Sequence, residues 1–191
     1  MKHAFSLATL LAGTAIGLTL ALAPAQAADP VIIGAAIAQS GVVAPYDEGP
    51  AQAMEVAVDE INAKGGVLGR PIKIIYADTK SDIAYGATAA QEVIDKGAQM
   101  VVVTCDYDYG GAAASVADGA NLIAFSTCAG DPKFGPSGIG PNAFTMATGS
   151  PGQAVALAEW AYNKQGWKTA YILLDTTIAF DASFADAFER R

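Results

Sequence analysis

Short apolar runs alternate with amphipathic helical stretches along most of this chain, and this alternation constrains the fold more than any other feature. The apolar runs that predict strands lie at 31–38, 72–77, 98–104, 122–126 and 169–174, with a shorter one at 143–148. The stretches that predict helices lie at 50–64, 83–96, 111–119, 151–165 and from Ala182 onward. Buried parallel strands need helical crossovers, so the pattern predicts an α/β fold with a doubly wound parallel sheet.

The helix expected over 50–64 shows this pattern clearly. Met54, Val58 and Ile61 recur at i, i+4 and i+7, which places them on one face. Residues 129–142, by contrast, are rich in Gly and Pro and predict a long loop.

The first 27 residues have the pattern of an export signal. Lys2 and His3 give a basic start, an uncharged run extends from Ala4 to Leu22, and Pro24 precedes the small-x-small sequence Ala25–Gln26–Ala27. We expect a signal peptide that is cleaved after Ala27, with export to the periplasm. The alternative is an uncleaved membrane anchor, because the run is nearly long enough to span a bilayer.

Charge and histidine content exclude several classes of protein. The chain has 11 basic and 19 acidic side chains; without Lys2, the one charged residue of the leader, 10 basic side chains remain and the net charge is −9. Nucleic acid is therefore not an expected partner, since nothing would neutralise its phosphates. The single histidine, His3, leaves with the leader, so we expect no His-dependent triad, no metal site and no cofactor.

The predicted elements divide the mature chain into two parts. Residues 28–148 hold the strands and helices of a first α/β lobe, and residues 149–191 hold the start of a second lobe. Arg191 falls inside a predicted helix without a cap, which predicts that the chain is cut off within its architecture.

Ligands of parallel α/β sheets bind at the carboxyl ends of the strands. The segments that follow these ends are 39–49, 78–82, 105–110 and 127–131. Tyr46 lies in the first of them, where its ring could stack on a ligand or fold back over the core. Asp175 and Asp181 form a carboxylate pair without a base, acid or metal partner, and we interpret this pair as structural.

Residues 105–110 (CDYDYG) place two acidic and two aromatic side chains at the end of a core strand. Asp106 and Asp108 are suited to a cationic or NH-rich group. The helix expected from Gly111 would offer bare amides to a carboxylate or amide oxygen. The alternative is a solvated acidic turn.

Cys105 and Cys128 each follow a core strand, and the two strands are expected to be neighbours. Adjacent strands lie about 4.8 Å apart, within the spacing that a disulfide needs. In an oxidising compartment we expect a Cys105–Cys128 bridge. The alternative is two buried free thiols.

Three segments carry a resemblance to a known family: SGVVAPYDEG at 40–49, DEINAKGGVLGRPIKIIYAD at 59–78 and TCAGDP at 127–132. With the leader, they make the chain similar to the leucine/isoleucine/valine-binding family of periplasmic proteins, the substrate receptors of ABC-type uptake transporters. The match at 59–66 is the most specific, and the resemblance extends over 31–191. It implies the type I periplasmic-binding fold, in which two α/β lobes hold the ligand in a cleft and close by hinge motion.

The resemblance also implies roles for individual residues. Tyr46 matches the aromatic that packs on the ligand side chain, and Phe180 matches a second-lobe aromatic that closes over the ligand. Cys128 and Ala129 fall where a backbone carbonyl receives the ligand ammonium.

Two departures from the family pattern affect the expected ligand. Asp106, Tyr107 and Asp108 stand where family amino-acid binders have a serine-rich run for the carboxylate, and Gly130 replaces the ammonium-binding threonine. A carboxylate beside two acidic groups is repelled unless they neutralise or point away. We therefore expect a small solute that is an amino acid or, given these loops, an amide or cationic compound with a flat or apolar body.

The resemblance implies a receptor and not an enzyme. We expect a monomer that binds its solute and docks on an inner-membrane ABC transporter permease. One alternative is a ligand sensor that feeds a signalling partner. Another is an enzyme that uses Asp106 and Asp108 as acid and base.

Overall fold

The computed structural model describes residues 29–191, so the expected signal peptide and its cleavage site lie outside the described residues. Five parallel strands form one sheet in the order β2-β1-β3-β4-β5. They are β1 (Val31–Ile37), β2 (Ile72–Asp78), β3 (Met100–Val103), β4 (Ile123–Ser126) and β5 (Ala143–Thr145). The expected doubly wound parallel sheet is confirmed.

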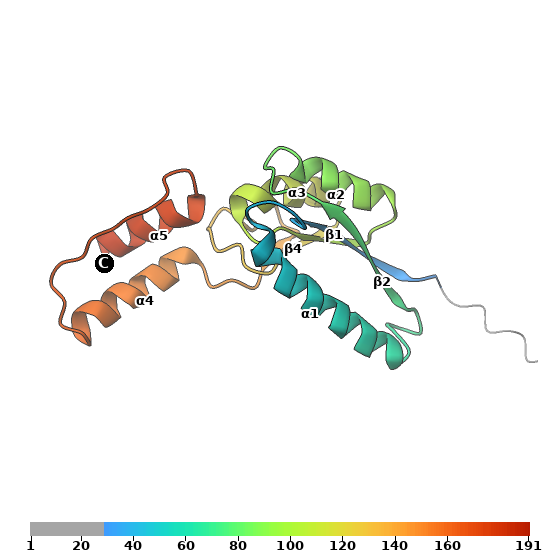
Figure 1. The fold of residues 1–191 in the computed structure, drawn as a ribbon, viewed down its shortest axis with the longest axis horizontal. Coiled ribbons are helices and arrows are strands. Elements are labelled where there is room, and N and C mark those ends of the chain that lie inside the picture. The colour runs from blue at the N-terminus through green and yellow to red at the C-terminus, as the bar shows by residue number, and fades with distance from the viewer. Residues whose placement is uncertain (1–28) are drawn as a thin grey trace, which may run out of the picture.

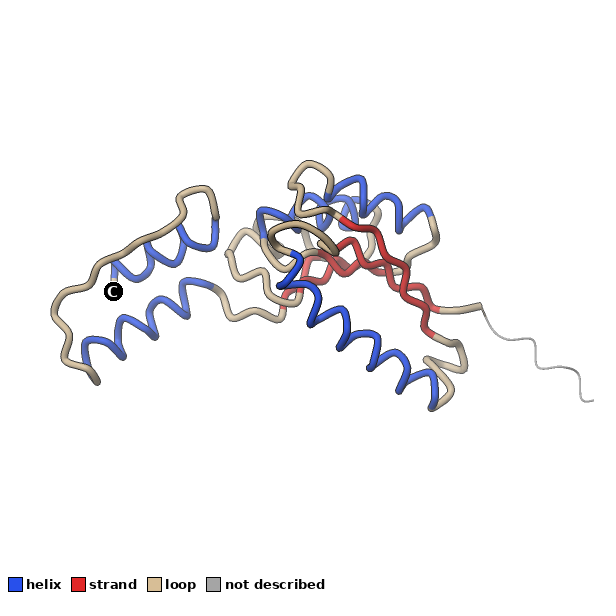
Figure 2. The backbone as a smooth tube through the Cα atoms, viewed as in Figure 1, coloured by secondary structure: helices blue, strands red, loops and turns tan. Residues whose placement is uncertain are grey.

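Helices cover both faces of this sheet. α1 (Ala44–Ala63) lies on one face, and α2 (Gly86–Asp95) and α3 (Tyr107–Gly119) lie side by side on the other (Figures 1 and 2). The chain therefore leaves β1 toward one face and leaves its neighbour β3 toward the other. This divergence opens a crevice at the carboxyl ends of the two strands, where sheets of this kind bind ligands.

Small residues fill the interior between the sheet and the helices α2 and α3. Ala36, Ala89 and Ala113 are fully buried there. A Cβ added to Gly34 of β1 would lie 2.6 Å from Cγ2 of Val93 in α2. The helix α2 therefore lies close against β1.

Two further helices, α4 (Ser150–Asn163) and α5 (Ala179–Arg190), pack against each other beside the sheet (Figure 1). We call residues 149–191 the α4–α5 pair. The strand expected at 169–174 is wrong: the segment is irregular, and Tyr171 and Leu173 are each 89% exposed. A strand needs a neighbour for its N–H and C=O groups, and residues 29–191 place no other strand beside this segment.

Three helices begin at least three residues earlier than the sequence predicts, and one of them is α5, which begins at Ala179 instead of Ala182. α1 begins at Ala44 instead of residue 50, with Pro45 in the first turn, where a missing N–H costs no intrahelical bond. α3 begins at Tyr107 instead of Gly111, because Asp106 caps it. The segments 44–49 and 107–110, expected as loops, are helical turns at the crevice.

Candidate functional site

A cleft of about 580 Å³ lies between the carboxyl edge of the sheet and the start of α5. It is located at the crevice where the connections from β1 and β3 diverge, the position at which parallel sheets bind ligands. Its walls consist of Val42, Val43, Tyr46, Cys105, Asp106, Tyr109, Cys128, Gly130, Asp175, Ile178, Phe180 and Asp181.

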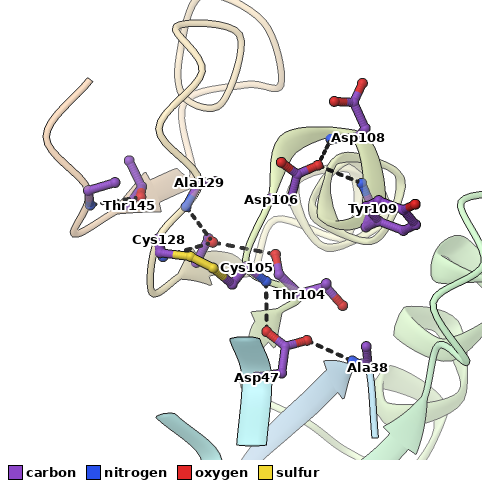
Figure 3. Close-up of a disulfide and its surroundings, with 12 residues drawn as sticks. Ala38, Asp47, Thr104, Cys105, Asp106, Asp108, Tyr109, Cys128, Ala129 and Thr145 are labelled. Carbon is purple, nitrogen blue, oxygen red and sulfur yellow. Dashed lines mark hydrogen bonds between the residues drawn. A yellow bond between two sulfur atoms is a disulfide. The ribbon is translucent and has the colours of Figure 1, made fainter. Parts of the chain in front are cut away.

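Asp47, in the first turn of α1, is a buried carboxylate at this edge, with only 3% of its surface exposed. One oxygen accepts the amide N–H of Ala38 at 2.7 Å, and the other accepts that of Cys105 at 2.8 Å (Figure 3). Burial raises the pKa of the Asp47 carboxyl above its usual 3.8, and the two amide hydrogen bonds oppose that rise. Nothing in the local sequence distinguishes Asp47 from its exposed neighbour Glu48, so its role was not foreseen.

Asp106 caps α3 with its own side chain. Its Oδ1 accepts the amide N–H of Asp108 at 2.7 Å and that of Tyr109 at 3.3 Å (Figure 3). The prediction that a helix starting at Gly111 offers bare amides to a ligand is therefore wrong, because the first-turn amides bond to Asp106. Burial raises the pKa of Asp106; the amide hydrogen bonds oppose the rise, and the charges of Asp108 and Asp131 add to it.

A disulfide joins Cys105, after β3, to Cys128, after β4 (Figure 3). The Cα atoms of the two cysteines are 4.9 Å apart, as expected for residues at the ends of neighbouring parallel strands. Both cysteines line the cleft, where Cys105 is buried and Cys128 is exposed. The expected bridge is present, and it forms part of the cleft floor.

Aromatic side chains supply much of the remaining wall. Tyr46 is 64% exposed and lines the cleft from the first turn of α1, so it does not fold back over the core. Tyr109 contributes from the first turn of α3 and Phe180 from that of α5. Of these three, Tyr109 was not singled out by the sequence; its place in the first turn becomes evident only once Asp106 is recognised as a cap.

Three residues expected at the site do not line the cleft. Tyr107 packs against the buried core, with Lys133 Nζ 5.4 Å from its ring centroid. Asp108 Oδ2 accepts the amide N–H of Ala179 at 2.8 Å. Ala129 is fully buried behind the disulfide, and its amide donates to Ser126 Oγ at 3.1 Å.

The charged side chains that line the cleft are acidic. Asp175 and Asp181, which the sequence suggested were structural, both line it together with Asp106. The amide of Asp175 donates to Asp181 Oδ2 at 3.2 Å, and hydrogen bonds from Thr177 lower the pKa of Asp175. Within residues 29–191, no Lys or Arg lines this cleft, and no three His, Cys, Asp or Glu side chains gather as metal ligands. In the same range, no helix is both long and apolar enough to cross a bilayer.

Comparisons with known proteins agree with this architecture. Over 84 residues, the chain is 38% identical to the Leu/Ile/Val-binding protein BraC3 of Rhizobium johnstonii, an alignment that covers 44% of this chain and 23% of that protein. Over 180 residues, it is 25% identical to Leu/Ile/Val-binding protein homolog 3 of Brucella melitensis, covering 94% of this chain and 48% of that protein.

Among solved structures, the chain is similar to the branched-chain amino acid transporter substrate binding protein LivJ from Streptococcus pneumoniae, which was determined in complex with isoleucine. The TM-score is 0.79 at 23% identity, over 85% of this chain and 46% of that one, and this likeness shows the fold. The chain thus spans about half the length of the Brucella and Streptococcus proteins. Residues 30–191 match the model of the family described as periplasmic binding protein. This chain therefore belongs to the periplasmic binding protein family.

Proposed function

We propose that this protein is the substrate-binding component of an ABC-type uptake transporter and holds a small solute in the cleft between the sheet edge and α5. The observation that carries this proposal is the cleft itself, which lies at the diverging ends of β1 and β3 and has Phe180 of α5 in its opposite wall. The relatives named Leu/Ile/Val-binding proteins support a solute of the branched-chain amino acid class. Binding without catalysis would be its role.

The charges at the cleft favour a particular kind of solute. Asp106, Asp175 and Asp181 face a space walled by aromatic rings and lined by no basic side chain of the described chain. Carboxylates bind cationic and NH-rich groups by charge-assisted hydrogen bonds, and aromatic faces bind flat or apolar bodies. We propose a solute with a cationic or NH-rich end and an apolar or flat body.

The start of α3 gives a second reason to expect that the cleft favours the ammonium end of an amino acid over its carboxylate end. A free helix start favours an anion, but Asp106 Oδ1 already accepts the amides of Asp108 and Tyr109. A solute carboxylate placed there would meet a carboxylate and not a free amide. An amine, amide or amidine has no such conflict.

Leucine and two compounds that each lack one of its charged groups test this proposal. They are L-leucine, 3-methylbutylamine (leucine without its carboxylate) and 4-methylpentanoate (leucine without its ammonium), with benzamidine as a flat cation. In thermal unfolding, a compound at a hundred times its Kd adds about 2.7 kcal/mol to the free energy of unfolding and raises Tm by several degrees. We expect 3-methylbutylamine or benzamidine to raise Tm more than L-leucine does, and 4-methylpentanoate to leave it unchanged.

The variant Asp106→Asn identifies the acidic contact. Asn caps a helix about as well as Asp, so α3 stays capped while the charge is removed. The affinity for the cationic compound should fall about tenfold, whereas Asp59→Asn, on the exposed face of α1, should leave it unchanged. A Tm that rises with L-leucine alone would assign the amino acid as solute and reject the cationic class; no shift with any compound would count against binding in this cleft.

Two further parts of the proposal concern export of the protein and its docking on the transporter. We propose that the protein is exported, that its mature form begins at Ala28, and that residues 28–148 and 149–191 belong to two lobes whose closed arrangement docks on a membrane permease. The intact mass of protein recovered from a periplasmic extract tests the cleavage site. A mass that includes residues 1–27 would contradict it.

A further inference from the structure

The helix α5 begins without a cap from its own segment. The residue before it, Ile178, has no side-chain acceptor, so the first N–H groups of the helix need partners from elsewhere. Asp108 provides one: its Oδ2 accepts the amide N–H of Ala179 at 2.8 Å from 71 residues earlier in the chain. A carboxylate at this end of a helix is also favoured by the helix dipole.

Phe180, the residue after Ala179, packs against Gly130 on the sheet side of the cleft. A Cβ added to Gly130 would lie 2.8 Å from Cε2 and 3.1 Å from Cδ2 of Phe180, so the ring fills the space that a side chain at 130 would occupy. The same ring centroid lies 6.0 Å from that of Phe184. Phe180 is therefore held between α5 and the backbone of Gly130, and in that position it forms part of the cleft wall.

We propose that Asp108 is a positioning residue for this cleft: by capping α5 it seats Phe180 on Gly130, and this sets the width of the cleft before a solute arrives. The inference rests on the proposed function, because it gives Asp108 an effect on solute affinity. The sequence predicts that Asp108 contacts the solute. In this proposal Asp108 acts on the cleft indirectly, through Ala179 and Phe180.

The reason for an effect on affinity is the population of the binding-competent arrangement. When α5 loses its cap, Phe180 is no longer held on Gly130, and the α4–α5 pair samples wider arrangements. The apparent affinity then falls in proportion to the fraction of molecules that keep the seated arrangement.

A measurement without solute tests the contact itself. Amide exchange of Ala179, followed by NMR, is compared between the wild type, Asp108→Ala and Asp108→Asn. We expect about tenfold faster exchange in Asp108→Ala, because a hydrogen bond to a charged acceptor is lost, and a smaller change in Asp108→Asn, which keeps an acceptor oxygen. Asp59→Ala is the control and should not change it. Unchanged exchange in Asp108→Ala would overturn the proposal.

Titration with 3-methylbutylamine tests the consequence for binding. We expect about tenfold weaker binding in Asp108→Ala and a smaller loss in Asp108→Asn. Gly130→Ala, which displaces Phe180 with Asp108 intact, should weaken binding as well. Equal losses in Asp108→Asn and Asp108→Ala would indicate a direct charge contact and overturn the positioning role. If the wild type binds none of the four trial compounds, the proposed function fails and the claimed effect on affinity fails with it, while the exchange rates still decide whether Asp108 caps α5.

Discussion

The carboxylate of Asp47 accepts the amide N–H of Cys105 at 2.8 Å. This hydrogen bond crosses the crevice between the ends of β1 and β3, the two strands whose following helices lie on opposite faces of the sheet. The second oxygen of Asp47 accepts the amide of Ala38, so one side chain of α1 joins the ends of β1 and β3. These two strands pair from Ile33↔Met100 to Ala36↔Val103, and the hydrogen bonds of Asp47 begin where that pairing ends. Asp47 therefore takes over the role of ladder hydrogen bonds at the mouth of the crevice.

Replacing Asp47 with Ala should lower the free energy of unfolding by about 3 kcal/mol. The substitution leaves two buried N–H groups, those of Ala38 and Cys105, without acceptors. Urea unfolding measures the change. The exposed acid Asp59 provides the control, since Asp59→Ala should stay within about 0.5 kcal/mol of the wild type. Equal effects of the two substitutions would show that the Asp47 hydrogen bonds do not stabilise the fold.

Asp78 and Asp47 should make stability depend on pH in opposite directions. Partial burial alone would raise the pKa of Asp78, but hydrogen bonds from the Ser40 hydroxyl and from the amides of Lys80, Gln39 and Ser40 hold it below its usual 3.8. A lowered pKa in the folded state gives stability that is present above pH 3.8 and is lost as the pH falls through the folded value. The stability difference between the wild type and Asp78→Asn should therefore shrink below pH 3.8.

The raised pKa of Asp47 has the opposite sign. The pH-dependent part of its contribution is fully present below pH 3.8 and is lost as the pH rises through the folded pKa, whereas the ionised carboxylate still accepts the two amide hydrogen bonds. Urea unfolding of the wild type and Asp47→Asn over this range measures the effect. A difference that grows with rising pH would contradict the assignment of a raised pKa to Asp47.

Removal of the disulfide should cost about 3 kcal/mol of stability, because Cys105 and Cys128 are 23 positions apart and the bridge closes a loop of that length. The double variant Cys105→Ala/Cys128→Ala should unfold at lower urea concentration, and added reductant should affect the wild type alone. A peptide map without reductant should contain the cross-linked peptide. Its absence would mean that the cysteines are free thiols.

A glycine series should separate close packing from helix propensity. In Gly110→Ala the new Cβ would lie 2.3 Å from the carbonyl oxygen of Thr104, so α3 must shift, at a cost of about 1–3 kcal/mol. Gly49, in α1, has nothing within 4 Å of an added Cβ, and Gly49→Ala should stabilise by about 0.5–1 kcal/mol. Similar effects at both positions would contradict the close approach of α3 to the sheet.

The continuous apolar runs located the first four strands of the chain to within two residues, because the strands of a parallel sheet with helices on both faces leave little choice of residue type. Val101 and Val103, nearly or fully buried in β3, illustrate this. The run at 169–174 has a similar composition and forms no strand, since strand formation also needs a neighbouring strand. That requirement is not local, and composition does not convey it.

Turn-forming residues caused the errors at the helix starts. Pro45 and Gly49 predict a loop before residue 50, yet both lie in α1. At α3 the local sequence does contain a helix-start signal: Asp106 is a good N-cap and Asp108 an acidic first-turn residue.

The sequence identifies part of the cleft wall. Tyr46, Asp106, Cys128 and Phe180, which the resemblance assigns to ligand binding, all line the cleft, because each follows a strand or begins a helix at the same edge. Their role toward a ligand stays a prediction. The contact of Asp108 with Ala179 spans 71 residues, and no spacing rule reveals it.

The α4–α5 pair buries few large side chains. Its buried apolar residues are Ala154, Ala161, Ala185 and Ala187. Resistance to local unfolding follows buried apolar contact, so this pair should open at a lower free energy than the sheet. A solute bound to Phe180 and Tyr46 would stabilise the seated arrangement alone. Occupancy of the cleft would then be detectable at a distance, as slower backbone exchange along α5 while exchange in α2 stays the same.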